Sequence, residues 1–243
     1  MRILREIYYA IFNNTKVIIR KPTILNGYKW ILDKNYGRAY FKGYYEPELT
    51  KYICESLYEE SCFLDIGSHA GYFSLLASAI AKKGQIICFE PDQNNYKFLQ
   101  SIKKINNVSN WTTINAAVGE EDGELRFKTG ASSSTGFVAN DGDVIVKQIS
   151  LDSFIGSMKI ARIDLIKIGV EGFGAYVLKG GIEVFKKFQP QILLECHLGS
   201  NEYAVAWELL NNTYDFYDFS NMKPINKYTT EQIDFVILKA KNN

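Results

Sequence analysis

Short apolar runs alternate along the chain with segments in which apolar residues recur three or four positions apart. A run of four or five apolar residues is typical of a strand buried in a parallel sheet. Helical spacing indicates helices that pack one face on such a sheet. Five runs predict sheet strands, at residues 63–66, 85–89, 111–114, 164–168 and 191–196, and two more predict closing strands near residues 214–219 and 235–239. The pattern therefore predicts an α/β protein with a doubly wound, mostly parallel seven-stranded sheet.

The start of the chain carries many aromatic and basic side chains without a clean period. Asn26-Gly27 is a turn signal between two short β-like runs, Thr23–Leu25 and Tyr28–Leu32, and predicts a hairpin. Met1–Phe12 predicts a helix that packs on the main domain, with a peripheral contact to a membrane as the alternative.

A helix-start signal marks where the main domain begins. Glu46-Pro47-Glu48 opens a helix, because proline suits the first helical turn and acidic residues suit its positive end. We therefore expect a cap at residues 1–45 and a Rossmann-like domain at residues 46–243.

A different pattern interrupts the predicted sheet after residue 119. Residues 124–128 and 144–149 alternate like half-exposed strands, and Thr129–Thr135 between them is small and rich in hydroxyls. The simplest interpretation is an antiparallel excursion with a loop at its tip. The hydroxyls of that loop could contact a polar substrate or be solvated.

The first predicted strand ends in a turn bounded by glycines. Asp65 closes the strand, Gly67 and Gly71 bound the turn, and apolar residues recur at helical spacing from Phe73 onwards. A strand, a glycine-rich turn and a helix in this order form the nucleotide-binding unit of many α/β sheets. Glycines let the backbone approach a ligand closely. An ordinary turn without a ligand is the alternative.

Polar or small residues stand at the predicted carboxyl ends of five strands, and ligands of doubly wound sheets bind beyond those ends. These residues are Asp65, Glu90, Asn115, Gly169 and His197. Glu90 follows the glycine turn by roughly 20 positions, where an acidic residue accepts hydrogen bonds from ribose hydroxyls. The alternative is a helix cap, and Asp92 can supply it while Glu90 contacts the ligand.

The turn favours S-adenosylmethionine over a dinucleotide. Its pattern is Gly-x-x-x-Gly, whereas a pyrophosphate needs a further glycine at the position of His69. The Asp65 carboxylate would repel pyrophosphate and attract the sulfonium and ammonium groups of S-adenosylmethionine. A nicotinamide-dependent oxidoreductase is the alternative that shares this fold class.

Five segments of the chain stand in a fixed order and spacing. They are Phe63-Leu64-Asp65-Ile66-Gly67-Ser68-His69-Ala70-Gly71-Tyr72, Phe89-Glu90-Pro91, Asn115-Ala116-Ala117-Val118-Gly119, Asp164-Leu165-Ile166-Lys167-Ile168-Gly169-Val170-Glu171-Gly172 and Leu194-Glu195-Cys196-His197. Together they resemble the FkbM-type methyltransferases. The resemblance implies a class I methyltransferase fold and methyl transfer from S-adenosylmethionine, usually to oxygen. Because many relatives modify hydroxyls of sugars, glycolipids or natural products, we expect an acceptor of this kind.

The resemblance also implies a cofactor site at the turn and at the next two strand ends. Asp65, Gly67 and Gly71 would form the methionine side, and Glu90 would hold the ribose. The cofactor-binding residues implied are Asp65, Gly67, Ser68, His69, Gly71, Tyr72, Glu90, Pro91, Asn115, Ala116 and Ala117.

The chain departs from the family pattern at three places. Ser68-His69 replaces the usual Ala-Asn, Gly169 stands where relatives commonly have aspartate, and Gly174 stands where they often have an acidic residue. Because two carboxylates are missing, the alternative function is a catalytically degenerate module that binds the cofactor or a partner.

A hydroxyl acceptor must lose its proton, which calls for a base near neutral pH. His197 at the fifth strand end is the first candidate, followed by Glu171 and Glu195. The alternatives are structural: His197 as a neutral residue bonded to the backbone, and Glu195 in a hydrogen bond inside its strand. Lys167 is expected to pair with Glu171 or Asp164.

The composition of the chain limits the kinds of molecule that we expect it to bind. The formal net charge of +1 suggests no nucleic acid partner, and no apolar run is long enough to span a membrane. The four cysteines are widely spaced without a CxxC pair, so we expect no metal site, reduced thiols and a cytoplasmic location. The expected partner is a small molecule, glycan or glycolipid, and the oligomeric state stays open.

Overall fold

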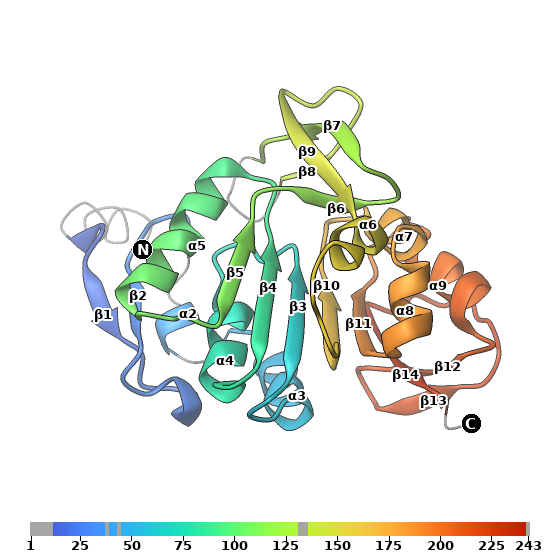
Figure 1. Ribbon diagram of the computed structural model, residues 1–243, viewed down its shortest axis with the longest axis horizontal. Helices are drawn as coiled ribbons and strands as arrows, with labels where there is room; N and C mark the ends of the chain where they lie inside the picture. The colour runs from blue at the N-terminus through green and yellow to red at the C-terminus, as the bar shows by residue number, and fades with distance from the viewer. Residues whose placement is uncertain (1–11, 37–38, 43–44, 131–135, 242–243) are drawn as a thin grey trace.

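The computed structural model describes residues 12–36, 39–42, 45–130 and 136–241. Its main sheet has eight strands in the order β13-β12-β14-β11-β10-β3-β4-β5 (Figure 1). The parallel strands are β3 (Cys62–Ile66), β4 (Gln85–Phe89), β5 (Trp111–Ile114), β10 (Leu165–Ile168) and β11 (Gln191–Glu195). The antiparallel strands are β14 (Phe235–Ala240), β12 (Tyr214–Asp218) and β13 (Lys223–Ile225). The predicted fold class is confirmed, and β13 extends the seven predicted strands by one.

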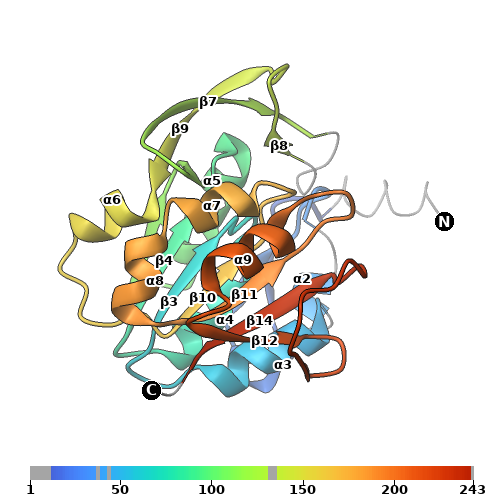
Figure 2. The same ribbon diagram turned by 90° about the vertical axis from the view of Figure 1, so that its right-hand side faces the viewer.

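Helices cover both faces of this sheet, because the buried strands point alternate side chains into two separate cores. Phe63 joins the core under α3 (Pro47–Ser56), α4 (Tyr72–Ile80) and α5 (Gln93–Ile105). Leu64 and Ile66 join the opposite core under α6 (Leu151–Gly156), α7 (Gly174–Lys179), α8 (Ile182–Phe188) and α9 (Glu202–Leu210). Figure 2 shows α7, α8 and α9 on this second face. No helix in the described part of the chain is long and apolar enough to cross a membrane.

The helical segment after β10 is divided into α7 and α8 at Gly180-Gly181. A side chain at Gly180 would overlap the carbonyl oxygen of Gly119, so the backbone passes too close for any other residue. Gly180 also accepts a hydrogen bond from the backbone N–H of Asp152 (2.9 Å), at the start of α6. The close approach therefore explains a break that apolar spacing alone does not show.

The hairpin expected near Asn26-Gly27 is only partly correct. The second strand exists as β2 (Lys29–Ile31), but it pairs with β1 (Lys16–Ile18). Thr23–Leu25 instead forms the short 3-10 helix η1, in which the backbone N–H of Leu25 donates to Pro22 (2.9 Å). The expected helix at Met1–Phe12 lies outside the described residues, except for its last residue.

The cap residues pack on the main domain through aromatic rings. Trp30 is fully buried and stacks on Tyr40 of α2 (Ala39–Lys42), with 5.1 Å between ring centroids. Its other edge meets Phe98 of α5, with centroids 5.7 Å apart. The two parts thus share one core, and the division at residue 45 stays a prediction.

A second sheet interrupts the alternation after β5, as expected from the sequence. Its strands lie in the order β6-β9-β7-β8, where β6 (Ala117–Gly119) and β9 (Val144–Ser150) are parallel. β7 (Gly123–Lys128) is antiparallel to β9 and to β8 (Phe137–Val138). This sheet, called the excursion sheet below, stands above the carboxyl ends of the main strands (Figure 1). The loop hydroxyls at residues 132–135 lie outside the described residues.

Candidate active site

A pocket with a cavity volume of about 140 Å³ opens at the carboxyl ends of the parallel strands. Residues at or just after the ends of these strands line it. Of the five residues predicted for this rim, Glu90 and Gly169 line the pocket, whereas Asp65, Asn115 and His197 do not, and Gly67, Ala116 and Glu195 beside them take those places. The excursion sheet closes the pocket from above with Phe127, Phe137 and Val138.

The turn after β3 needs its glycines for two different close approaches. Gly67 has a φ of 78°, and a side chain there would overlap the carbonyl oxygen of Gly169. Gly71 has a φ of 81°, and its Cβ would come within 2.9 Å of the Trp111 ring. His69 between them also has a positive φ, 49°. The turn is therefore pressed against the β10 end on one side and against β5 on the other.

Glu90 holds this turn against the loop after β4. Its carboxylate accepts hydrogen bonds from the backbone N–H groups of His69 (2.7 Å) and Asp92 (2.9 Å), and it lines the pocket. Burial raises the pKa of Glu90 to about 7. Asp92 caps α5 by accepting from the backbone N–H groups of Asn94 and Asn95, both at 2.8 Å. The helix-cap role predicted for Asp92 is confirmed.

Asp65 lies beneath the pocket and is only 1% exposed. Its carboxylate accepts a hydrogen bond from Ser74 of α4, and its Oδ1 has no hydrogen-bond partner. Burial raises the pKa of Asp65, and the charge of Lys167 opposes that rise. This carboxylate therefore faces α4 and is absent from the pocket lining, so any influence on a ligand would act through Lys167 and the turn.

Six of the eleven residues implied as cofactor contacts line the pocket, and five support it from behind. The lining residues are Gly67, His69, Glu90, Pro91, Ala116 and Ala117, and the supporting residues are Asp65, Ser68, Gly71, Tyr72 and Asn115. Ser68 Oγ donates to the Asp65 carbonyl oxygen (2.6 Å). Asn115 Nδ2 donates to the carbonyl oxygens of Glu90 (2.8 Å) and Pro91 (3.1 Å). These bonds fix the two loops that carry the lining residues.

Sequence reasoning missed several lining residues. Most of these are apolar residues at or just beyond strand ends, or come from the cap and the excursion sheet. They are Tyr45, Glu46, Ile66, Phe89, Asn95, Val118, Phe127, Gly136, Phe137, Val138, Lys167, Val170 and Phe173. The strand-end rule could have found Ile66, Phe89 and Val170. Nothing in the local sequence marks the excursion residues, because their place depends on how that sheet folds back.

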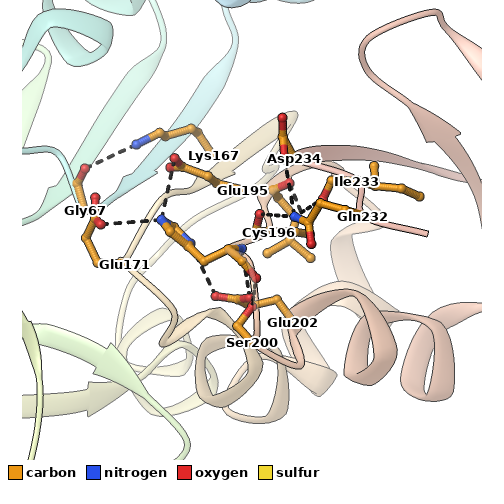
Figure 3. Close-up of polar contacts among 12 residues, drawn as sticks. Gly67, Lys167, Glu171, Glu195, Cys196, Ser200, Glu202, Gln232, Ile233 and Asp234 are labelled. Carbon is orange, nitrogen blue, oxygen red and sulfur yellow. Dashed lines mark hydrogen bonds and ion pairs between the residues drawn. The ribbon is translucent and has the colours of Figure 1, made fainter. Parts of the chain in front are cut away.

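The three candidate catalytic residues meet at the far end of the pocket (Figure 3). His197 Nε2 lies 3.5 Å from Glu171 Oε2 and 3.8 Å from Glu195 Oε1. A fourth residue, Glu202 of α9, approaches from the opposite side, with its Oε1 3.6 Å from His197 Nδ1. The imidazole is thus enclosed by three carboxylates. Within the described residues, no group of three or more His, Cys, Asp or Glu side chains is arranged to hold a metal ion.

These carboxylates decide the protonation of His197. Hydrogen bonding to Glu171, and next to Glu202, raises the pKa of His197 to about 10. The imidazole therefore carries its proton at neutral pH, whereas a base must be free of one. Burial raises the pKa of Glu195, and the charge of Lys167 partly opposes this. The direction of these shifts favours Glu195 over His197 as the candidate base, and the base roles of both residues stay predictions.

Charged neighbours fill the space beside Gly169 and Gly174, the two glycines that depart from the family pattern. A Cβ at Gly169 would meet Lys167 Nζ and would lie 2.7 Å from Glu195 Oε2. A Cβ at Gly174 would lie 2.8 Å from Glu202 Cγ. The side chains of Lys167 and Glu195 therefore occupy the space beside position 169, and the aliphatic part of Glu202 occupies the space beside position 174.

Comparison with known proteins identifies the family. Residues 65–222 match the methyltransferase FkbM domain. The chain belongs to this family. Its members use S-adenosylmethionine, so the predicted family and cofactor are confirmed.

Two relatives illustrate the match. The hexuronic acid methyltransferase AglP of Haloferax volcanii is 23% identical over 158 residues, which cover 63% of each chain. The chain therefore matches less than two thirds of the length of this relative. The crystal structure of methyltransferase FkbM from Methylobacillus flagellatus superposes with a TM-score of 0.52 at 15% identity, covering 75% of this chain and 44% of that one. At this identity the second likeness supports the fold alone.

The pocket of this FkbM methyltransferase suits the chemistry of its cofactor. One part is apolar, with Phe89, Ala116 and Val118, and contains the buried Glu90 carboxylate. The other part is rich in carboxylates from Glu46, Glu171 and Glu195. An adenine ring and ribose match the first part, and sulfonium and ammonium charges match the second.

Proposed function

We propose that this chain transfers a methyl group from S-adenosylmethionine to a hydroxyl oxygen of a sugar, glycolipid or natural product. The observation that carries the proposal is the position of Glu195, a pocket-lining carboxylate at the end of β11 whose pKa is raised by burial. A base with a raised pKa accepts a hydroxyl proton better than an ordinary surface carboxylate does. Glu171 lies beside it and also lines the pocket.

The cofactor would be held by the first part of the pocket. The Glu90 carboxylate is placed to accept hydrogen bonds from the ribose, and Ala116 and Ala117 leave room for the adenine. The turn at Gly67 and His69 would hold the methionine side through its backbone. We propose the other implied contact residues as supports for these two loops.

Methyl transfer depends mainly on holding the reacting atoms in line. When bound, the cofactor would supply a methyl group on a sulfonium, and a carbon–oxygen bond to the acceptor would replace the carbon–sulfur bond, whose electron pair stays on sulfur. Glu195 accepts the hydroxyl proton as the carbon–oxygen bond forms. Lys167 Nζ donates to the Gly67 carbonyl oxygen (3.3 Å), and among the described residues it does not form the expected ion pair with Glu171 or Asp164. Its charge and the His197 imidazole, with Nε2 3.8 Å from Glu195 Oε1, both favour the charged form of Glu195. The excursion sheet covers the pocket and limits access of water.

Aromatic rings at the same end of the pocket support a sugar-like acceptor. Phe173 lines the pocket and stacks on Tyr176, with ring centroids 4.5 Å apart and an interplanar angle of 21°. Phe137 lines the opposite wall and is 40% exposed. Such ring faces pack on the apolar faces of sugars, while carboxylates bond the hydroxyls. The relative AglP, named for a hexuronic acid, agrees with this class of acceptor.

The cell compartment is part of the same proposal. All four cysteines are free, and Cys62, Cys88 and Cys196 are buried. Reduced thiols suit a cytoplasmic enzyme.

The alternative functions have less support. The degenerate module rested on the two glycines at positions 169 and 174, but the side chains of Glu195 and Glu202 fill those spaces. The family match favours a methyltransferase over a nicotinamide-dependent oxidoreductase.

The proposal is tested by removing the charge of Glu195 alone. Purified protein with methyl-labelled S-adenosylmethionine is offered a panel of glycosides, glycolipids and natural-product alcohols. We expect labelled ethers with the wild type, and a loss of about 100-fold or more in kcat with Glu195→Gln. Calorimetry should show that the variant still binds S-adenosylmethionine, more weakly because one of three nearby carboxylate charges is gone, so kcat is compared at saturating cofactor.

Glu183→Gln serves as the matched control, because this exposed carboxylate pairs only with Lys186 on α8. It should keep full turnover. Full turnover by Glu195→Gln would refute the base role. A rate that climbs about tenfold per pH unit up to pH 10 would return that role to His197.

A further inference from the structure

A buried carboxylate stands behind the catalytic end of the pocket. The side chain of Glu202 is only 1% exposed, although it is the first residue of α9. Its Oε2 accepts a hydrogen bond from the backbone N–H of His197 (3.3 Å), and its Oε1 lies 3.6 Å from His197 Nδ1. A buried carboxylate is costly unless a positive charge or several donors compensate for it. The His197 imidazole is the charged group placed to do so.

The room for this carboxylate comes from Gly174. A Cβ at position 174 would lie 2.8 Å from Glu202 Cγ and 3.2 Å from Leu194 Cδ1. Both distances are shorter than normal carbon contacts, so any side chain there would push Glu202 away. Gly174 begins α7 with no positive φ, so its backbone places no demand for glycine. The buried position of Glu202 therefore requires that residue 174 has no side chain.

The opposite edge of the imidazole faces the pocket wall. Nε2 lies within 4 Å of Glu171 and Glu195, and both carboxylates line the pocket, whereas His197 itself does not. The charged groups that surround His197 are thus Glu171 from the loop after β10, Glu195 from β11 and Glu202 from α9. Lys167 of β10 lies on the far side of Glu195. Figure 3 shows Glu202 on the side away from Glu171, Glu195 and Lys167.

We propose that Glu202 is a positioning residue, which holds the His197 imidazole in its charged form with Nε2 turned toward Glu171 and Glu195. The charged imidazole in turn holds these two carboxylates side by side at the pocket wall, despite their mutual repulsion. With glycine at position 174 of α7, the space beside His197 is taken by the Glu202 side chain from α9. The catalytic meaning of this arrangement rests on the proposed function, but the arrangement itself does not.

A titration followed by NMR tests this directly, because His69 and His197 are the two histidines of the chain. The full-length protein is labelled on its imidazole nitrogens and observed from pH 5 to pH 11 without any acceptor. In the wild type, we expect the His197 signal to change near pH 10. Glu202→Gln should lower that midpoint by one pH unit or more, which is about tenfold in proton affinity. The His69 signal should stay as in the wild type.

Gly174→Ala provides a second variant that removes no charge. It should lower the His197 midpoint as well, because the added methyl displaces Glu202, and it favours the helix rather than breaking it. Two matched controls should leave the midpoint unchanged. Glu208→Gln removes an exposed carboxylate from the same helix, and Gly156→Ala adds a methyl where nothing lies within 4 Å.

A wild-type midpoint below pH 7 would overturn the proposal, and so would equal midpoints in the wild type and Gly174→Ala. Since the titration uses no methyl acceptor, its result is independent of the transfer assay. Failure to find any methylated product would count against the proposed function alone.

Discussion

The buried Glu90 carboxylate should make the stability of this protein fall as the pH rises through neutrality. Only 5% of the residue is exposed, and its oxygens are committed to backbone N–H groups on two loops. Burial nevertheless dominates, because it raises the pKa from 4.5 to about 7. The folded form therefore binds this proton more tightly than the unfolded form does. Its contribution to stability is complete below about pH 4.5 and is lost as the pH rises through about 7.

The size of the effect follows from the two pKa values. One unit of difference in pKa between the folded and unfolded forms corresponds to about 1.4 kcal/mol of stability at 25 °C, so the complete effect on the free energy of unfolding is about 3 kcal/mol. Most of it, about 2.5 kcal/mol, falls between pH 5 and pH 8. Glu90→Gln keeps a neutral side chain at every pH. The substitution loses one backbone hydrogen bond, but that cost is the same throughout the range.

Urea unfolding of both proteins at several pH values isolates this group, since all other titrations cancel in the difference. The free energy of unfolding of Glu90→Gln, minus that of the wild type, should increase by about 2.5 kcal/mol from pH 5 to pH 8. A difference that stays flat would refute the reasoning. Calorimetry at pH 8 then tests the ribose role separately, because Glu90→Gln should bind S-adenosylmethionine more weakly than the wild type.

Two further predictions concern glycines. Gly67→Ala should lower the free energy of unfolding, measured in urea, by about 3 kcal/mol, because φ is positive there and the new Cβ would overlap a backbone carbonyl. Gly27→Ala is the control: φ is also positive, but nothing lies within 4 Å, so the loss should be about 1 kcal/mol. Equal losses in the two variants would contradict the packing argument. Gly169→Asp should fold, because the atoms it displaces are the flexible ends of Lys167 and Glu195, but methyl transfer should fall about tenfold or more as Glu195 moves. Faster transfer by Gly169→Asp would mean that the missing aspartate had limited the wild type.

The main sheet could be predicted from the sequence because its strands are buried on both faces. Ile86–Phe89 is an uninterrupted apolar run, and Trp111–Ile114 combines apolar ends with two β-branched threonines. The predicted strands Gln85–Phe89 and Trp111–Ile114 both match the observed ones. Strand β13 escaped prediction because Lys223–Ile225 is a short edge strand without an apolar run. The break between α7 and α8 escaped for another reason: the contact of Gly180 with Gly119 joins segments 61 positions apart.

The site was predictable where function follows from position at a strand end. Glu90 and Gly169 line the pocket as predicted, because they directly follow parallel strands. Strand β11 ends at Glu195, two residues before the predicted His197, so Glu195 lines the pocket and His197 does not. The role of Glu202 could not be predicted, since its place depends on how α9 packs on α7. The same holds for the protonation of His197, which depends on three carboxylates from three separate segments.

The excursion sheet divides the molecule into a part that maintains the fold and a part that shapes the pocket. It supplies Phe127, Phe137 and Val138 to the pocket, yet none of them belongs to either main core. Its strand β9 exposes Ile145, which is 63% accessible. Substitutions in β7 and β8 can therefore alter the wall above the acceptor with little cost to the eight-stranded sheet. For the proposed methyl transfer, this makes β7 and β8 the place to change acceptor selectivity, whereas β6 carries Ala117 and Val118 of the adenine part and is left intact.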